Sequence, residues 1–97
     1  MATFISLINY TQQGIEKIKE APKRLDAAKQ AFQSMGVELK GFYLTMGRYD
    51  IVTISEAPEA ETMQKALLVL SMGGNVRSET LTASPEEEFR KIISGLP

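Results

Sequence analysis

Thr45-Met46-Gly47-Arg48-Tyr49-Asp50 lies between two runs of apolar, β-branched and aromatic residues, 37–46 and 51–54. A short link that contains glycine between two such runs predicts a tight β-hairpin, with Gly47 supplying the positive φ that a type II′ turn requires at its first central position. This hairpin would pair the two runs as antiparallel strands. It would also place Arg48, Tyr49 and Asp50 together at one end of a sheet.

Two further strands and three helices are predicted around this hairpin. Apolar patterning predicts strands at 4–10, 37–46, 49–55 and 76–83, with a helix after the first, third and fourth of them. Pro22 interrupts the first helix and predicts a kink or a short break near 20–21, and Gly36 ends that helix. The order βαββαβ with an extra C-terminal helix predicts an α+β, ferredoxin-like fold, with 1–97 as a single domain.

Three local features refine this prediction. The apolar alternation of 37–46 changes phase at Gly41, which indicates a β-bulge or a strand covered on both faces. The strand at 76–83 is more polar than the others, which favours an edge position or a place beside a partner. Ser84-Pro85-Glu86-Glu87 predicts the start of the last helix, with Ser84 as its capping residue.

Composition excludes several classes of chemistry. The 97 residues carry a net charge of −1 and include neither cysteine nor histidine. These absences remove disulfides, thiolate nucleophiles, the commonest general base and the usual zinc and haem ligands. We expect no cofactor and no metal; any metal would be a hard ion held by oxygens.

Charge and hydropathy also bear on partners and location. A net charge of −1 gives no broad attraction to nucleic acid or anionic lipid. No apolar run approaches the ~20 residues of a membrane-spanning helix, and the first residues lack a signal-type apolar core. We expect no nucleic-acid or membrane partner and a cytoplasmic location.

The predicted sheet has more apolar residues than two helices can cover. Phe4, Ile8, Tyr43, Ile51 and Val76 are spread over several strands, and a lone subunit would leave one face of the sheet exposed. A second copy packed sheet to sheet would cover it and bury on the order of 1,600 Å². We therefore expect a homodimer or a higher homo-oligomer.

The run 42–52 resembles the GYD family, named for a Gly-x-Tyr-Asp signature, which here is Gly47-Arg48-Tyr49-Asp50. The resemblance covers nearly the whole chain, through 10–15, 22–24, 56–58 and 74–77. It departs at Glu59, where the family more usually has aspartate. The resemblance implies a ferredoxin-like fold of the dimeric α/β-barrel type and no particular reaction. Related barrels include cofactor-free oxygenases, haem-degrading enzymes and ligand-sensing domains, so the fold leaves the function open.

The candidate ligand-binding residues are Tyr10, Arg24, Tyr43, Arg48, Tyr49, Asp50 and Arg77. The three tyrosines would line a pocket between sheet and helices, or pack as core aromatics whose hydroxyls reach a partner. The arginines at 24 and 77 would form an anion site, or structural ion pairs with Asp50, Glu56 or Glu79. Asp50 would act at the mouth of a cleft, or would bind local backbone amides.

Two functions follow from these alternatives. The missing nucleophile and base favour an oligomeric, non-catalytic module that binds a small molecule or regulates another protein, with its cavity between sheet and helices or between subunits. The alternative is a cofactor-free oxygenase or isomerase, in which Asp50 and Tyr49, helped by Tyr43 and Arg77, would transfer protons and stabilise an anion. A concave pocket around Asp50 would favour the enzyme, whereas an Asp50 bound to backbone amides would argue against it.

Overall fold

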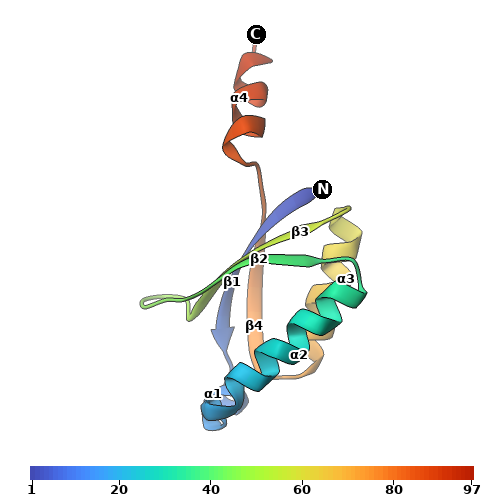
Figure 1. Cartoon of the computed structure of the whole chain (residues 1–97). Coiled ribbons are helices and arrows are strands. Elements are labelled where there is room, and N and C mark those ends of the chain that lie inside the picture. Colours follow the sequence, from blue (N-terminus) through green and yellow to red (C-terminus); the bar gives the residue numbers. More distant parts are fainter.

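The computed structural model describes residues 1–97 and has the predicted order of elements (Figure 1). In chain order these are β1 (Ala2–Tyr10), α1 (Gln12–Glu16), the 3₁₀ helix η1 (Ile18–Glu20), α2 (Ala21–Ser34), β2 (Glu38–Leu44), β3 (Ile51–Ala57), α3 (Ala60–Met72), β4 (Val76–Ala83) and α4 (Glu86–Ser94). The α+β, ferredoxin-like prediction with an extra C-terminal helix is confirmed.

The four strands form one antiparallel sheet in the order β2-β3-β1-β4, so the polar β4 lies at an edge as predicted. In β1, Phe4, Ser6 and Ile8 are buried beneath the helices. Ile5 and Leu7 alternate with them and point to the opposite side, where they remain partly exposed. We call this second side the open face.

The predicted bulge is present in β2. Its register against β3 shifts between Leu39 and Gly41, which leaves Lys40 as the extra residue. Leu39 pairs with β3 at Ser55, on the helix side. After the shift, Phe42 is again on the helix side and Tyr43 is on the open face. The phase change in the sequence therefore marks a bulge, and it keeps apolar residues facing the helices.

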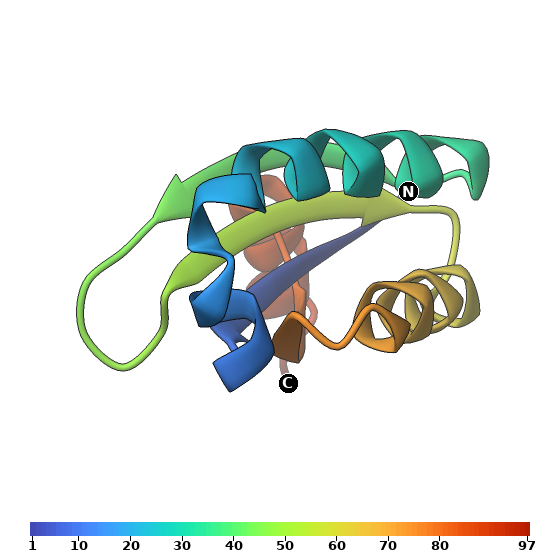
Figure 2. The same cartoon turned by 90° about the horizontal axis from the view of Figure 1, so that it is seen from below.

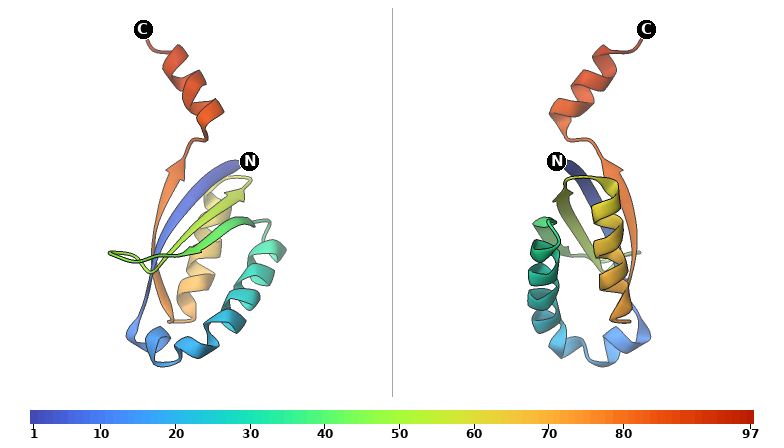
Figure 3. Two further views of the ribbon diagram at one scale, coloured as in Figure 1. Left: turned by 60° about the vertical axis from the view of Figure 1, so that its left-hand side comes forward. Right: turned by 90° about the vertical axis from the view of Figure 1, so that its right-hand side faces the viewer.

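The break before Pro22 is also confirmed. η1 follows α1, and α2 begins at Ala21 with Pro22 in its first turn, where a missing N–H costs little. Gly36 ends the helix with a φ of +85°. α2 and α3 lie on the same side of the sheet (Figure 3), with α2 over β2 and α3 beside β4 (Figure 2).

The tightly packed core occupies one end of the helix–sheet layer. It comes from the start of β1, the end of α2 and the start of α3, and comprises Phe4, Phe32, Val37, Ala57, Met63 and Ala66. The end of β1, the start of α2 and the end of α3 meet at the opposite end of the sheet. That end is packed less densely and contains the site described below.

The link between β2 and β3 is wider than predicted. The Thr45 N–H donates to the Asp50 carbonyl at 2.8 Å, and four residues, 46–49, lie between this pair. Gly47 has the predicted positive φ, +104°, but the prediction of a two-residue type II′ turn is wrong. The Thr45 hydroxyl donates to the Tyr49 carbonyl at 2.6 Å, and this bond across the link stabilises the wider turn.

α4 projects away from the rest of the chain (Figures 1 and 3). None of its residues is buried, and its apolar side chains, Phe89, Ile92 and Ile93, are about half exposed. The helix is capped by the extended Pro85 without a side-chain bond, so the prediction that Ser84 caps it is wrong. None of the helices combines the length and apolar character that a bilayer crossing requires.

Candidate functional site

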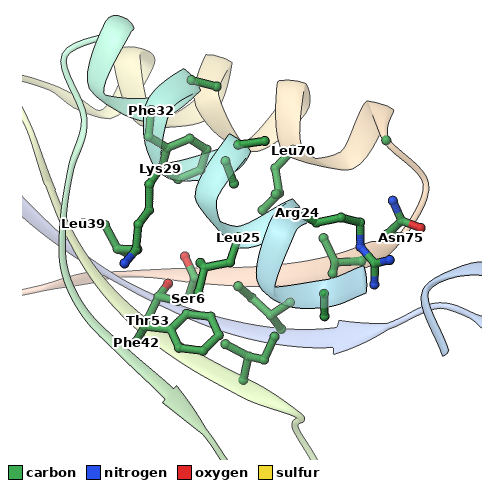
Figure 4. Close-up of a pocket in the computed structure, with 18 of the residues that line it drawn as sticks. Ser6, Arg24, Leu25, Lys29, Phe32, Leu39, Phe42, Thr53, Leu70 and Asn75 are labelled. Carbon is green, nitrogen blue, oxygen red and sulfur yellow. The ribbon is translucent and has the colours of Figure 1, made fainter. Parts of the chain in front are cut away.

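A cavity of about 540 Å³ lies between the sheet and the two helices (Figure 4). Ser6 and Thr53 form part of its floor, and Leu25 of α2 and Leu70 of α3 cover it from above. Of its 23 lining residues, 16 are hydrophobic. Its volume falls within the range of roughly 300–1,000 Å³ that is usual for sites that bind small molecules.

Small side chains explain why the layer is not filled here. Ser6 and Thr53 occupy adjacent inward positions on β1 and β3, where larger apolar residues would continue the core. Ala21 and Ala28 of α2 also line the cavity. The Ser6 hydroxyl is within 2.8 Å of the Thr80 hydroxyl, so it is satisfied without a ligand. The small side chains that line the layer therefore account for the cavity.

Asp50 forms hydrogen bonds with the end of β1 at one end of the sheet. Its carboxylate Oδ2 accepts from the Tyr10 N–H at 2.9 Å, and its own N–H donates to the Ile8 carbonyl at 2.9 Å and to Asn9 Oδ1 at 3.1 Å. Asp50 thus fastens the β2–β3 link to the end of β1. A carboxylate held by a backbone amide is a structural acceptor, and Asp50 is not among the residues that line the cavity.

The turn after β1 is bound to the turn before β4. The Thr11 N–H donates to the Asn75 carbonyl at 3.0 Å, and the Thr11 hydroxyl donates to the Gly74 carbonyl at 2.6 Å. Thr11 also caps α1 as predicted, by accepting from the Gly14 N–H. Gly14 approaches Asn75 so closely that a Cβ on Gly14 would collide with the Asn75 carbonyl. Tyr10 and Asn75 then line the cavity at this end.

Comparison with known proteins identifies the family. The profile of the GYD domain matches residues 4–93. The chain belongs to the GYD domain family. The GYD signature is the Gly47–Asp50 segment, whose aspartate holds the end of β1.

A curated relative supports this assignment. The "Glutamine synthetase and cystathionine beta-lyase binding protein" of Thermus thermophilus is 36% identical over 86 residues, which span 88% of this chain and 90% of the relative.

Two solved structures share the fold. The crystal structure of TTHA0845 from Thermus thermophilus has a TM-score of 0.56 at 22% identity and covers 88% of this chain and 95% of that one. The C-terminal domain of the MgtC protein from Mycobacterium tuberculosis has a TM-score of 0.53 at 14% identity, over 84% of this chain and 86% of that one. At these identities the likeness concerns the fold alone.

The two candidate arginines of this GYD domain are on opposite sides of the sheet. Arg24 lines the cavity, and its guanidinium donates to the Lys17 carbonyl at 2.9 Å and to the Gly14 carbonyl at 3.2 Å. Arg77 pairs with Asn9 on the open face. The structure does not bring them together as one anion site, and neither forms an ion pair. Arg24 instead holds the end of α1, since its charge suits the free carbonyls there.

The three tyrosines are also separated. Tyr10 lines the cavity, whereas Tyr43 is 57% exposed on the open face. The Tyr49 hydroxyl donates to Glu79 Oε1 at 2.9 Å, with Arg48 Cζ 6.0 Å from the centre of its ring. The hydrogen bond to Glu79 is the main cause that raises the pKa of Tyr49 above its ordinary value.

Of the seven candidate residues, Tyr10 and Arg24 therefore reach the cavity. Sequence reasoning missed Ser6, Lys29, Phe42 and Thr53. Two signals were available: Ser6 interrupts the apolar side of β1, and Lys29 is four residues from Leu25 on the apolar side of α2. No group of three or more acidic, cysteine or histidine side chains is placed to hold a metal ion.

Proposed function

We propose that this GYD domain is an oligomeric, non-catalytic module that binds a small, largely apolar molecule and regulates another protein. The observation that carries the proposal is the cavity of about 540 Å³, which is lined mostly by hydrophobic side chains and lies beneath both helices. Apolar cavities that contain a few polar groups are the usual form of small-molecule sites. The small residues on its floor and roof keep that space open.

The position of Asp50 supports a non-catalytic role. A general base must have a free carboxylate within reach of the substrate. Asp50 Oδ2 is held by the Tyr10 amide, and the Tyr49 hydroxyl is held by Glu79 on the open face. The two residues that the enzyme alternative requires thus have structural partners outside the cavity.

The proposed oligomer uses the open face. Ile5 pairs with Ile54, and Leu7 with Val52, so four aliphatic side chains form a continuous patch across the two central strands. Leu81 extends this patch to β4. An exposed apolar patch of this kind marks an interface. A second copy fits it, because a two-fold axis through the patch would place aliphatic side chains against their own equivalents.

The exposed helix α4 also favours a second copy as the partner of the open face. It follows β4 directly, beyond Leu81 and Ala83, and its apolar side is without cover in the single chain. Leu81 is the residue of the patch that is nearest to this helix along the chain. The second copy would cover both surfaces at once, which would bring the interface toward the usual total of about 1,600 Å².

The test is thermal unfolding of the wild-type protein and of Ala28→Phe across a broad metabolite panel. A ligand that occupies the cavity should raise the melting temperature of the wild type, because it binds the native state alone. The benzyl group at position 28 would project into the cavity, compete with a ligand for that space, and should reduce or abolish that increase. A panel without any hit would remove the support for ligand binding, as would a hit that Ala28→Phe leaves unchanged.

A second candidate function is supported by the curated relative. Its name says that it binds glutamine synthetase and cystathionine beta-lyase, so we propose enzyme binding as the regulatory output of this chain. Sedimentation velocity with purified glutamine synthetase and cystathionine beta-lyase of the same organism tests this. We expect this chain to co-sediment with one of them; independent sedimentation of all three proteins would contradict it.

A further inference from the structure

We propose that the cavity is a site for a monoanionic carboxylate with an apolar body, such as a medium-chain fatty acid or an aromatic acid, and that Lys29 binds the carboxylate. This inference rests on the proposed ligand-binding function and adds to it a class of ligand. It also adds one residue that recognises the charge of that ligand.

The charges around the cavity are of one sign. Arg24 and Lys29 line it, and no aspartate or glutamate does. Most of the remaining lining residues are hydrophobic. An apolar space with cations and no anions favours a ligand with an apolar body and one negative group, since a cationic ligand would have no partner.

Lys29 is the cation that is free to bind the ligand. Arg24 already donates to the Gly14 and Lys17 carbonyls. The ion pairs of the chain involve Lys40, Lys65 and Arg90, so Lys29 takes part in none of them. Lys29 extends from α2 toward the sheet beside Leu39, whereas Arg24 lies at the other end of the cavity near Asn75 (Figure 4). A carboxylate at Lys29 would leave its apolar body over Phe42 and Thr53, below Leu25.

A purely structural role for Lys29 makes a different prediction. A lysine can cover apolar surface with its methylene groups while its ammonium remains in water. In that case the head group of the ligand would not change its affinity. Ligands that share one tail and differ in head group therefore separate the two roles.

The experiment is calorimetric titration of the full chain with decanoate, decanol and decyltrimethylammonium, below their micellar concentrations. Naphthylacetate replaces decanoate in a parallel titration, to distinguish an aromatic body from an alkyl chain. We expect one decanoate per chain, bound about threefold more tightly than decanol, with the ammonium compound weakest. The difference should decrease as salt is added, because Lys29 is exposed.

Two lysines of α2 provide a matched pair of variants. Lys29→Met keeps a flexible apolar side chain and removes the charge, and it should make decanoate bind no more tightly than decanol. Lys23→Met removes a charge from the same helix outside the cavity and should leave the preference intact. Circular dichroism of both variants checks that α2 is unchanged.

The outcomes separate this inference from the function on which it rests. Equal binding of decanoate and decanol, both abolished by Ala28→Phe, would retain the apolar cavity and overturn recognition of the carboxylate. Failure of all four ligands would also overturn the apolar-ligand function.

Discussion

Tyr49 and Glu79 join two parts of the sheet that are 30 residues apart in the sequence. The Tyr49 hydroxyl donates to Glu79 Oε1 at 2.9 Å. Tyr49 belongs to the link between β2 and β3, and Glu79 belongs to β4, with β1 between them in the sheet. The tyrosine of the GYD signature therefore contacts the edge strand, while the aspartate beside it holds the end of β1.

This contact predicts a pH dependence at the alkaline end. The pKa of Tyr49 is raised in the folded chain, first by the hydrogen bond to Glu79 and then by desolvation. A raised pKa means that the native state holds the phenolic proton more tightly than the unfolded state does. The resulting stabilisation is present below the unfolded pKa of about 10 and is lost as the pH rises through the folded pKa.

The variant that tests this dependence is Tyr49→Phe. Its melting temperature should fall less steeply above pH ~10 than that of the wild type. Some decline will remain, because the pKa of Lys40 is also raised, mainly by its hydrogen bond to Glu38. Tyr10→Phe, which removes a phenol that has no carboxylate partner, is the control. Parallel alkaline curves for the wild type and Tyr49→Phe would contradict the assignment.

Asp50 predicts a second effect, on stability. Replacing it with alanine removes the acceptor of the Tyr10 N–H and should lower the free energy of unfolding by about 1–2 kcal/mol, as is typical for a bond to a charged group at a partly exposed site. Asp50→Asn keeps an acceptor oxygen and should cost less. Urea denaturation of both variants measures the difference. An Asp50→Ala protein as stable as the wild type would rule out this structural role.

The sequence predicted the fold well because its strongest signals are local. Pro22 and Gly36 delimit α2 through backbone restrictions that act within a turn, and the phase change at Gly41 follows from the alternation of a single strand. The width of the β2–β3 link was not predictable in this way. It depends on the Thr45 hydroxyl, which donates to the Tyr49 carbonyl across the link, and on the Asp50 N–H, which donates to β1.

The site was less predictable, because a cavity depends on what several elements leave unfilled. Motif residues such as Tyr49, Asp50 and Arg77 attract attention by their chemistry, yet the register of β1 against β3 and β4 places them outside the cavity. The residues that create the cavity, such as Ser6 and Ala28, are small and chemically plain. Their effect is visible only when α2 is placed over β1 and β3.

Gly14 provides a test of how the cavity end is held. A Cβ at this position would collide with the Asn75 carbonyl, which is backbone and cannot move without displacing the start of β4. Gly14→Ala should therefore lower the free energy of unfolding by about 1–3 kcal/mol. Gly95→Ala, at the end of α4, meets only ordinary contacts and should be close to neutral. The free energies of unfolding of the two variants, measured in parallel by chemical denaturation, test whether α1 packs this closely against Asn75.

The open face provides a test of the proposed oligomer. Ile54 belongs to the aliphatic patch and pairs with Ile5, the residue at its centre. Glutamate at this position would place like charges opposite one another across the two-fold axis of the proposed dimer and would bury them without partners, so Ile54→Glu should prevent that dimer from forming. Light scattering should then give half the mass of the wild type, while circular dichroism remains that of the folded chain. Ser71→Glu on the exposed surface of α3 adds the same charge elsewhere and should leave the mass of the proposed dimer unchanged. Because the patch is on the side of the sheet opposite the cavity, Ile54→Glu should retain ligand binding. A wild-type monomer at micromolar concentration would exclude the proposed assembly and would leave the proposal for the cavity unaffected.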